Sequence, residues 1–198
     1  MIEHSPVYTA TLMRHSETPS AAVRGIEVRI SWLQTGQDGA LALTYILTGD
    51  CAKLRIPPPR PPARVDGLWR HTCFEAFLAI QGDSAYRECN FSPSGEWAVY
   101  HFRGYRDRST VGEEELVPKI VTQSTEQSLE LDARLFLSPP LTTQPLRLAL
   151  SAVIEDNLGV LSYWALRHPP GKPDFHHAEA FMLGIAPLHG ETTRRGTR

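Results

Sequence analysis

Apolar and polar residues alternate along this sequence in short runs, and each run ends at a turn signal such as glycine, proline or asparagine. A period of two is typical of half-buried strands, and no segment keeps a convincing helical period. The predicted strands cover residues 7–15, 25–33, 40–47, 68–80, 86–91, 96–102, 118–123, 129–135, 146–154, 160–168 and 178–185. We therefore expect an all-β protein, an antiparallel and jelly-roll-like β-sandwich of about 10–11 strands.

Length, composition and charge fit a single domain. The 198 residues are 41% hydrophobic, which supplies one sizeable core, and no repeat or composition break marks a second domain. We expect a domain at residues 1–188 and a disordered basic tail at residues 189–198, which contains Arg194, Arg195 and Arg198. The net charge of -2 offers no basic surface for nucleic acid or an anionic membrane. Neither is expected as a partner, and the sequence leaves the oligomeric state open.

The cysteines indicate a reducing compartment. Cys51, Cys73 and Cys89 form an odd, sparse set without CxxC spacing, which argues against both a disulfide framework and a cysteine zinc site. The N-terminus lacks the basic and apolar regions of a secretory signal, and no run approaches the roughly 20 apolar residues of a spanning helix. A cytoplasmic location is expected.

Residues 69–102 carry the most information about function. The turn sequence at residues 81–84 separates two strand runs, so these should pair as a hairpin. A two-residue loop at Gly82 and Asp83 would place Glu75 opposite Asn90 in the neighbouring strand. On that register one side of the hairpin is a core, formed by Phe74, Ala76, Leu78, Cys89 and Phe91.

The opposite side of the hairpin carries Trp69, His71, Cys73, Glu75, Glu88 and Asn90, which could converge on one ligand. A solvated sheet face would also be polar, but a tryptophan is costly there, which favours a binding face. The turn at residues 92–95 leaves the side of Trp97 open. A glycine bulge at Gly95 would bury Trp97 behind Phe91, which we favour, whereas a tighter loop would move it to the Asn90 side.

A second group of polar residues lies in the late loop, which we define as residues 167–177. Its prolines stiffen the backbone, and its candidate ligand-binding residues are His168, Lys172, Asp174, Phe175, His176 and His177. Metal binding and an incidental surface loop are the alternatives. Adjacent histidines on an extended chain point to opposite sides, so only one of His176 and His177 could share a metal with Asp174, and no metal site is predicted.

The segments 68–78 (LWRHTCFEAFL) and 90–97 (NFSPSGEW) resemble the DOMON-like superfamily, within it the bacterial DOMON-like proteins related to family 9 carbohydrate-binding modules. The resemblance runs from about residue 8 to residue 185. It implies a β-sandwich whose concave face holds a sugar or, in other branches, haem. It also implies an aromatic that precedes a hydrogen-bonding glutamate in the same strand, matched by Trp69 and Glu75. The family's second clamping aromatic comes from late in the domain, where Phe175, His176 or His177 would replace a tryptophan.

These observations predict a non-catalytic module that binds a small ligand, most simply a sugar or sugar-like metabolite, because an aromatic ring stacks on a pyranose while carboxylate and amide groups take its hydroxyls. A haem-binding, cytochrome-like domain is one alternative, but only Met13 and Met182 are available as internal methionine ligands. A glycosidase using Glu75 and Glu88 is another, although no activated nucleophile is evident. A protein-interaction module remains a fourth hypothesis.

Overall fold

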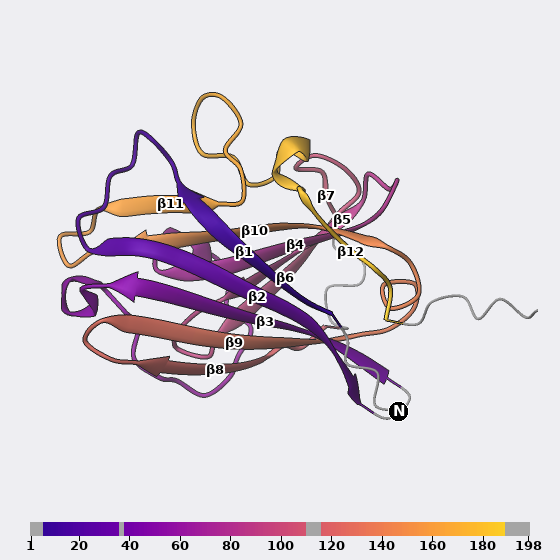
Figure 1. Cartoon of the computed structure of the whole chain (residues 1–198), viewed down its shortest axis with the longest axis horizontal. Helices are drawn as coiled ribbons and strands as arrows, with labels where there is room; N and C mark the ends of the chain where they lie inside the picture. The colour runs from indigo at the N-terminus through magenta and orange to yellow at the C-terminus, as the bar shows by residue number, and fades with distance from the viewer. Residues whose placement is uncertain (1–5, 36–37, 110–115, 189–198) are drawn as a thin grey trace, which may run out of the picture.

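The computed structural model describes residues 6–35, 38–109 and 116–188. The architecture is an antiparallel β-sandwich, as predicted (Figure 1). The predicted basic tail at residues 189–198 lies outside the described residues. Within the described ranges, no helix has both the length and the apolar character needed to cross a bilayer.

Two sheets pack face to face, and β1 (Val7–Arg14) pairs with both. The lower sheet in Figure 1 continues from β1 through its remaining strands β2 (Val23–Thr35), β3 (Asp38–Gly49), β9 (Ser128–Leu137) and β8 (Lys119–Ser124). The upper sheet contains β7 (Arg108–Ser109), β6 (Trp97–Phe102), β5 (Tyr86–Phe91), β4 (Cys73–Ile80), β10 (Leu146–Glu155), β11 (Leu161–Ala165) and β12 (Leu183–Ile185). Both β11 and β12 pair with β10, at different points along it.

Three short 3-10 helices complete the described elements: η1 (Cys51–Lys53), η2 (Leu68–Arg70) and η3 (Ala178–Ala180). Two of them replace the beginnings of predicted strands, because the run at 68–80 becomes a strand only at Cys73 and the run at 178–185 only at Leu183. The segment between the predicted strands 96–102 and 118–123 also holds the two-residue strand β7, which is too short to show an alternating pattern.

The core lies between the two sheets and follows the alternation of each strand. In β4 the inward residues Phe74, Ala76 and Leu78 are fully or almost fully buried against the lower sheet. The hairpin has the predicted register, with Glu75 opposite Asn90. The core prediction for Trp97 is also confirmed, because this residue pairs with Phe91 and belongs to the same buried cluster.

The turn between β5 and β6 explains the position of Trp97. Gly95 has a left-handed φ of 91°, and its N–H donates to the carbonyl of Ser92. This is the conformation that a glycine bulge requires and that other residues adopt at a cost. The extra residue in the turn sets β6 so that Trp97 faces the core.

A buried hydrogen bond ties the two sheets together at β4. The hydroxyl of Tyr45, in β3, donates to the main-chain carbonyl of Glu75 at 2.8 Å, and Tyr45 is fully buried. A buried hydroxyl needs such a partner, since an unpaired polar group in the core costs free energy. The bond fixes the height of the Glu75 backbone above the lower sheet.

We predict that Tyr45→Phe lowers the free energy of unfolding by about 1 kcal/mol, the net value of one buried hydrogen bond. Tyr8→Phe is the matched control, because the Tyr8 hydroxyl makes only an exposed 3.4 Å contact with the N–H of Ala186. Urea unfolding of both variants measures the difference. Equal losses of unfolding free energy in the two variants would show that the hydrogen bond between the sheets does not stabilise the fold more than an exposed contact does.

Candidate ligand-binding site

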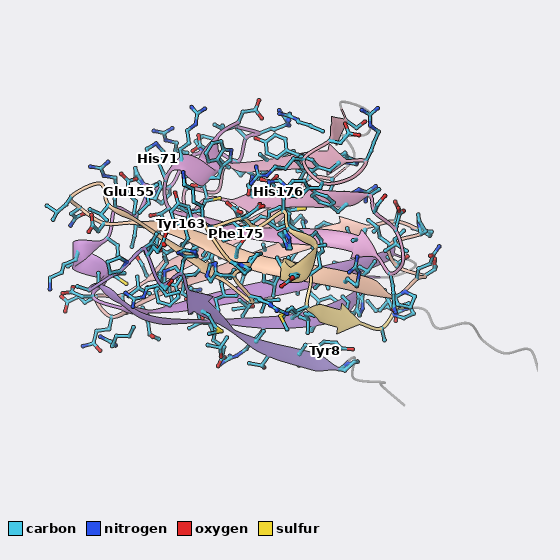
Figure 2. The ribbon with its side chains drawn as sticks, turned by 90° about the horizontal axis from the view of Figure 1, so that it is seen from above. Tyr8, His71, Glu155, Tyr163, Phe175 and His176 are labelled. Carbon is cyan, nitrogen blue, oxygen red and sulfur yellow. The ribbon has the colours of Figure 1, made fainter. Side chains whose placement is uncertain are left out.

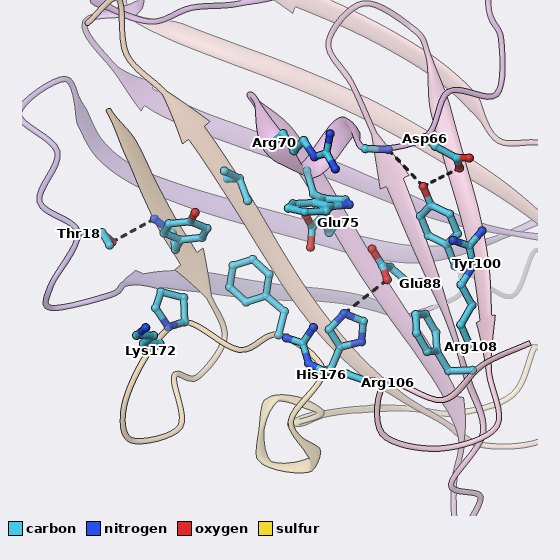
Figure 3. A pocket seen from close by; sticks show the side chains of 17 residues that line it. Thr18, Asp66, Arg70, Glu75, Glu88, Tyr100, Arg106, Arg108, Lys172 and His176 are labelled. Carbon is cyan, nitrogen blue, oxygen red and sulfur yellow. Dashed lines mark hydrogen bonds and ion pairs between the residues drawn. The ribbon is translucent and has the colours of Figure 1, made fainter. Parts of the chain in front are cut away.

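A hollow lies on the outer face of the upper sheet, the face turned away from the core. Across this face Glu75 stands in a row between Ser151 of β10 and Asn90 of β5. The row continues to Ala98 on one side and through Ala165 to Met13 on the other. Because Ser151, Ala165 and Ala98 have small side chains, the sheet surface is low at these positions. The result is a cavity of about 760 Å³, within the usual range for small-molecule sites (Figure 3).

The cavity is lined by both charged and aromatic residues. Its charged lining residues are Asp66, Arg70, Glu75, Glu88, Arg106, Arg108 and Lys172, and its aromatic rings are Trp69, Tyr100, Phe102, Tyr163, Phe175 and His176. Figure 3 shows Glu75 and Glu88 toward the middle, with the labelled arginines and Lys172 around them.

The late loop and η3 cover the remainder of the outer face. There Phe77 of β4 contacts the rings of His176 and Phe181, with centroids 5.1 and 6.2 Å apart, and Tyr86 stacks on Phe102 at 4.8 Å. This second apolar cluster is separate from the core between the sheets. The outer face is therefore buried at one end and hollow at the other.

The late loop is held over the sheet by Asp174. Its carboxylate accepts hydrogen bonds from the Tyr105 hydroxyl at 2.7 Å and from the Arg106 guanidinium at 2.8 Å. Arg106 is the one described non-glycine residue with a positive φ, 54°, a conformation that costs roughly 1 kcal/mol. The contacts of Arg106 with Asp174 and of its N–H with the Tyr86 hydroxyl oppose that cost.

Glu75 and Glu88 are buried carboxyl groups at the floor of the cavity. Burial, and secondarily the charge of Glu88, raise the pKa of Glu75 well above its usual value, although the Ser151 hydroxyl donates to its Oε2 at 3.2 Å. Burial raises the pKa of Glu88 to about 7, against the hydrogen bond that Asn90 donates to its Oε1 at 2.7 Å. Burial thus favours the protonated form of Glu75, which can both donate and accept hydrogen bonds.

His176 lies beside Glu88 in its neutral form. Burial, and secondarily the positive charge of Arg106, lower the pKa of His176 to about 4. The Tyr86 hydroxyl already accepts the Arg106 N–H, so we assign it as the donor to His176 Nδ1 at 2.8 Å. The ring hydrogen then stands on Nε2, 3.6 Å from Glu88 Oε2.

Two aromatic surfaces face the hollow from opposite parts of the chain. Trp69 in η2 is 47% exposed, a large exposed area for a tryptophan. Tyr163 of β11 and Phe175 of the late loop lie with ring centroids 6.1 Å apart (Figure 2). Such rings can cover the apolar side of a sugar or a similar flat ligand.

The structure brings together some of the sequence-predicted site residues. The predicted residues that line the cavity are Trp69, Glu75, Glu88, Lys172, Phe175 and His176. Of the candidates for a second aromatic surface, Phe175 and His176 are thus present at the cavity and His177 is not. The two glutamates stand two rows apart on one face, as the predicted register requires.

Two of the predicted hairpin residues, His71 and Asn90, do not line the cavity. β4 begins only at Cys73, so the strand alternation does not extend to His71, whose Nδ1 instead donates to Glu155 at 2.7 Å away from the cavity (Figure 2). Asn90 does lie on the predicted face, but it is fully buried and donates to Glu88.

Three of the predicted late-loop residues, His168, Asp174 and His177, also do not line the cavity. His168 donates from Nε2 to the carbonyl of Met13, and His177 accepts the Glu179 N–H at the beginning of η3. Asp174 faces Arg106 and holds the loop in place. The polar groups of these three residues are thus engaged in contacts within the protein, which shape the loop.

Sequence reasoning missed Tyr163, Tyr100 and the three arginines of the cavity, Arg70, Arg106 and Arg108. The alternation in β11, where Ser162 and Trp164 are buried, could have placed Tyr163 on the outer face. Arg70 lies in a 3-10 helix, Arg106 in a loop and Arg108 in a strand of two residues, so no period indicates the direction of these side chains.

The residues present do not fit a haem with methionine ligation. Met13 and Met182 are 64% and 57% exposed, and neither lines the cavity, while Nδ1 of His176 is bonded to Tyr86. Among the residues that the structure describes, no group of three or more His, Cys, Asp or Glu side chains could hold a metal ion.

The fold of this chain resembles those of several solved proteins. A Bacteroides uniformis protein, provisionally described as carbohydrate-binding, aligns with a TM-score of 0.65 and 16% identity over 91% of this chain and 86% of its own. A family 9 carbohydrate-binding module from Caldicellulosiruptor kristjanssonii aligns with a TM-score of 0.56 and 13% identity. Its complex with cellotriose covers 97% of this chain and 87% of its own, and its complex with glucose covers 94% and 86%. The sequence matches no protein-family model and no curated protein.

We predict that Glu88→Gln stabilises the protein increasingly as the pH rises from about 4.5 to about 7. In that window the unfolded chain loses the Glu88 proton while the folded protein retains it. The free energy of unfolding of the wild type therefore falls by up to about 3 kcal/mol, whereas that of the variant does not change for this reason. Denaturant unfolding at pH 4.5, 6 and 8 measures this gain. Glu126→Gln, at an exposed carboxyl, is the control. A gain that is the same at all three pH values would contradict the buried, titrating carboxyl.

We also predict that Asp174→Asn increases amide hydrogen exchange at residues 172–177, because it weakens the contacts to Tyr105 and Arg106. The global unfolding free energy should change by no more than about 1 kcal/mol, since the Arg106 partner is exposed. Asp107→Asn removes the neighbouring pair with Arg103, which does not contact the late loop, and should leave this exchange unchanged. Equal exchange in both variants would disprove the tethering role of Asp174.

Proposed function

We propose that this protein is a non-catalytic carbohydrate-binding module and that a saccharide occupies the hollow on the upper sheet. The observation that carries the proposal is the position of the exposed Trp69 ring at a cavity whose floor holds two buried carboxyl groups, Glu75 and Glu88. The aromatic ring supports an apolar sugar face, and the carboxyls take the ring hydroxyls. The carbohydrate-binding structures of the same fold support this assignment.

The burial of Glu75 favours a binding role over nucleophilic attack. A retaining glycosidase needs a carboxylate as its nucleophile, whereas burial raises the pKa of Glu75 well above its usual value and so favours its protonated form. Glu75, which is 2% exposed and bonded by Ser151, is suited to donate a hydrogen bond to a ligand rather than to attack it.

We predict that Trp69→Ala weakens saccharide binding by at least about tenfold, the loss expected for a stacked ring and the surface that it buries. Isothermal titration with a panel of mono- and disaccharides, followed by thermal shift with the best binder, measures the effect. Phe136→Ala is the control, because Phe136 is a partly exposed ring on β9 of the other sheet. The proposal fails if no sugar in the panel gives heat at millimolar concentration.

A turnover assay separates binding from hydrolysis. The wild type should release no product from aryl glycosides over hours at pH 5–8, while still binding the sugar found by titration. Turnover that Glu75→Gln abolishes would instead identify a hydrolase.

A further inference from the structure

The lining of the cavity contains more cations than a neutral sugar needs. Four basic side chains, Arg70, Arg106, Arg108 and Lys172, surround the hollow, against the carboxyls of Asp66, Glu75 and Glu88. What these charges can recognise depends on which of them already have partners within the protein.

Two of the cations are engaged by other protein groups. Arg106 forms an ion pair with Asp174 at 2.8 Å, as described above. The guanidinium of Arg108 stacks over the Tyr100 ring, 4.3 Å from its centroid, and has further interactions. Both side chains help to build the wall of the cavity.

The carboxyls leave little negative charge in the hollow. Asp66 lies at the edge, where it pairs with Arg64 at 3.3 Å and accepts the Tyr100 hydroxyl at 2.9 Å. Burial raises the pKa of Glu75, which favours its neutral form, and raises that of Glu88 to about 7, so that Glu88 carries only part of a negative charge at neutral pH. The floor therefore presents hydrogen-bonding groups with little net charge to a ligand.

Arg70 and Lys172 have no carboxylate within ion-pair distance among the residues that the structure describes. The Arg70 guanidinium lies over the Trp69 ring, 5.2 Å from its centroid, so it stands next to the proposed stacking surface. Lys172 reaches the cavity from the late loop, between Gly171 and Pro173. Figure 3 shows the two cations on different sides of the hollow, and both are exposed to solvent before a ligand arrives.

We propose that the saccharide is anionic, and that Arg70 receives its carboxylate or phosphate substituent while the sugar ring lies over the floor at Glu75 and Lys172 attracts the same charge from the other side of the hollow. This inference rests on the proposed function and specifies the class of ligand. A planar guanidinium matches the two oxygens of either substituent, and the lysine adds a second positive charge from the opposite wall. A ligand that enters this partly enclosed site brings its charge near both cations, where solvent screening is weaker than at an open surface.

The test compares matched neutral and anionic sugars by isothermal titration at low salt. Glucose and methyl glucoside are the neutral probes, glucuronate carries a carboxylate, and glucose 1-phosphate and glucose 6-phosphate carry phosphates. We expect at least one anionic sugar to bind at least about tenfold more tightly than glucose, with the advantage shrinking as sodium chloride rises. The arm that shows the advantage identifies carboxylate or phosphate as the substituent.

In the double variant Arg70→Gln with Lys172→Gln, the dissociation constant for glucose divided by that for the preferred anionic sugar should be close to one. The matched control is Lys119→Gln with Arg134→Gln, which removes the same charge from adjacent positions on the outer side of the lower sheet. That control should keep the wild-type ratio. Thermal unfolding of both double variants verifies that they are folded.

The outcomes separate this inference from the proposed function. If glucose and the anionic sugars bind equally well and Trp69→Ala weakens the binding of all of them, the proposal of an anionic ligand is wrong. The proposed carbohydrate-binding function is then still supported. No binding of any sugar would overturn the proposed function as well. Citrate or inorganic phosphate binding as tightly as the anionic sugars would indicate an anion site without sugar recognition, which also contradicts the inference.

Discussion

The structure depends on the fact that β4 is buried on both sides. Phe74, Ala76 and Leu78 face the core between the sheets, while Phe77 and Ala79 are covered by the late loop and η3. A shift of one residue would exchange these two sets and place Glu75 in the apolar core, where a carboxyl has no partner. The register of the central strand is therefore strongly fixed, and the position of the floor of the cavity is fixed with it.

Burial on the outer face also determines the electrostatics of the site. The same late loop that covers Phe77 removes solvent from Glu88 and His176, which raises the pKa of the first and lowers that of the second. Both groups therefore approach their neutral forms, and they lie side by side without a strong ion pair. The floor of the cavity thus carries little charge, while its walls carry several charged side chains. The net charge of the whole chain, which is close to zero, does not indicate this local arrangement.

The sequence was sufficient to predict the parts of this protein that follow a regular period. The strand alternation and the turn at residues 81–84 placed Glu75 opposite Asn90, and Gly95 placed Trp97 in the core. His71 does not line the cavity, because η2 interrupts the period two residues before β4 begins. Trp69 does reach the cavity, but from that 3-10 helix rather than from the strand. Arg106 could not be predicted, since its contribution depends on a left-handed backbone and on a contact with residue 174, far along the chain.

The attachment of the late loop has a consequence for how this scaffold can vary. β11 pairs with β10 up to Ala165, opposite Ser151, and β12 rejoins the same strand at Leu183, opposite Leu148. Both ends of the intervening segment are thus anchored three positions apart on one strand. Insertions, deletions or a grafted segment there can alter one wall of the cavity without disturbing any strand pairing. Ligand preference can therefore diversify among proteins of this architecture while the sheets remain the same.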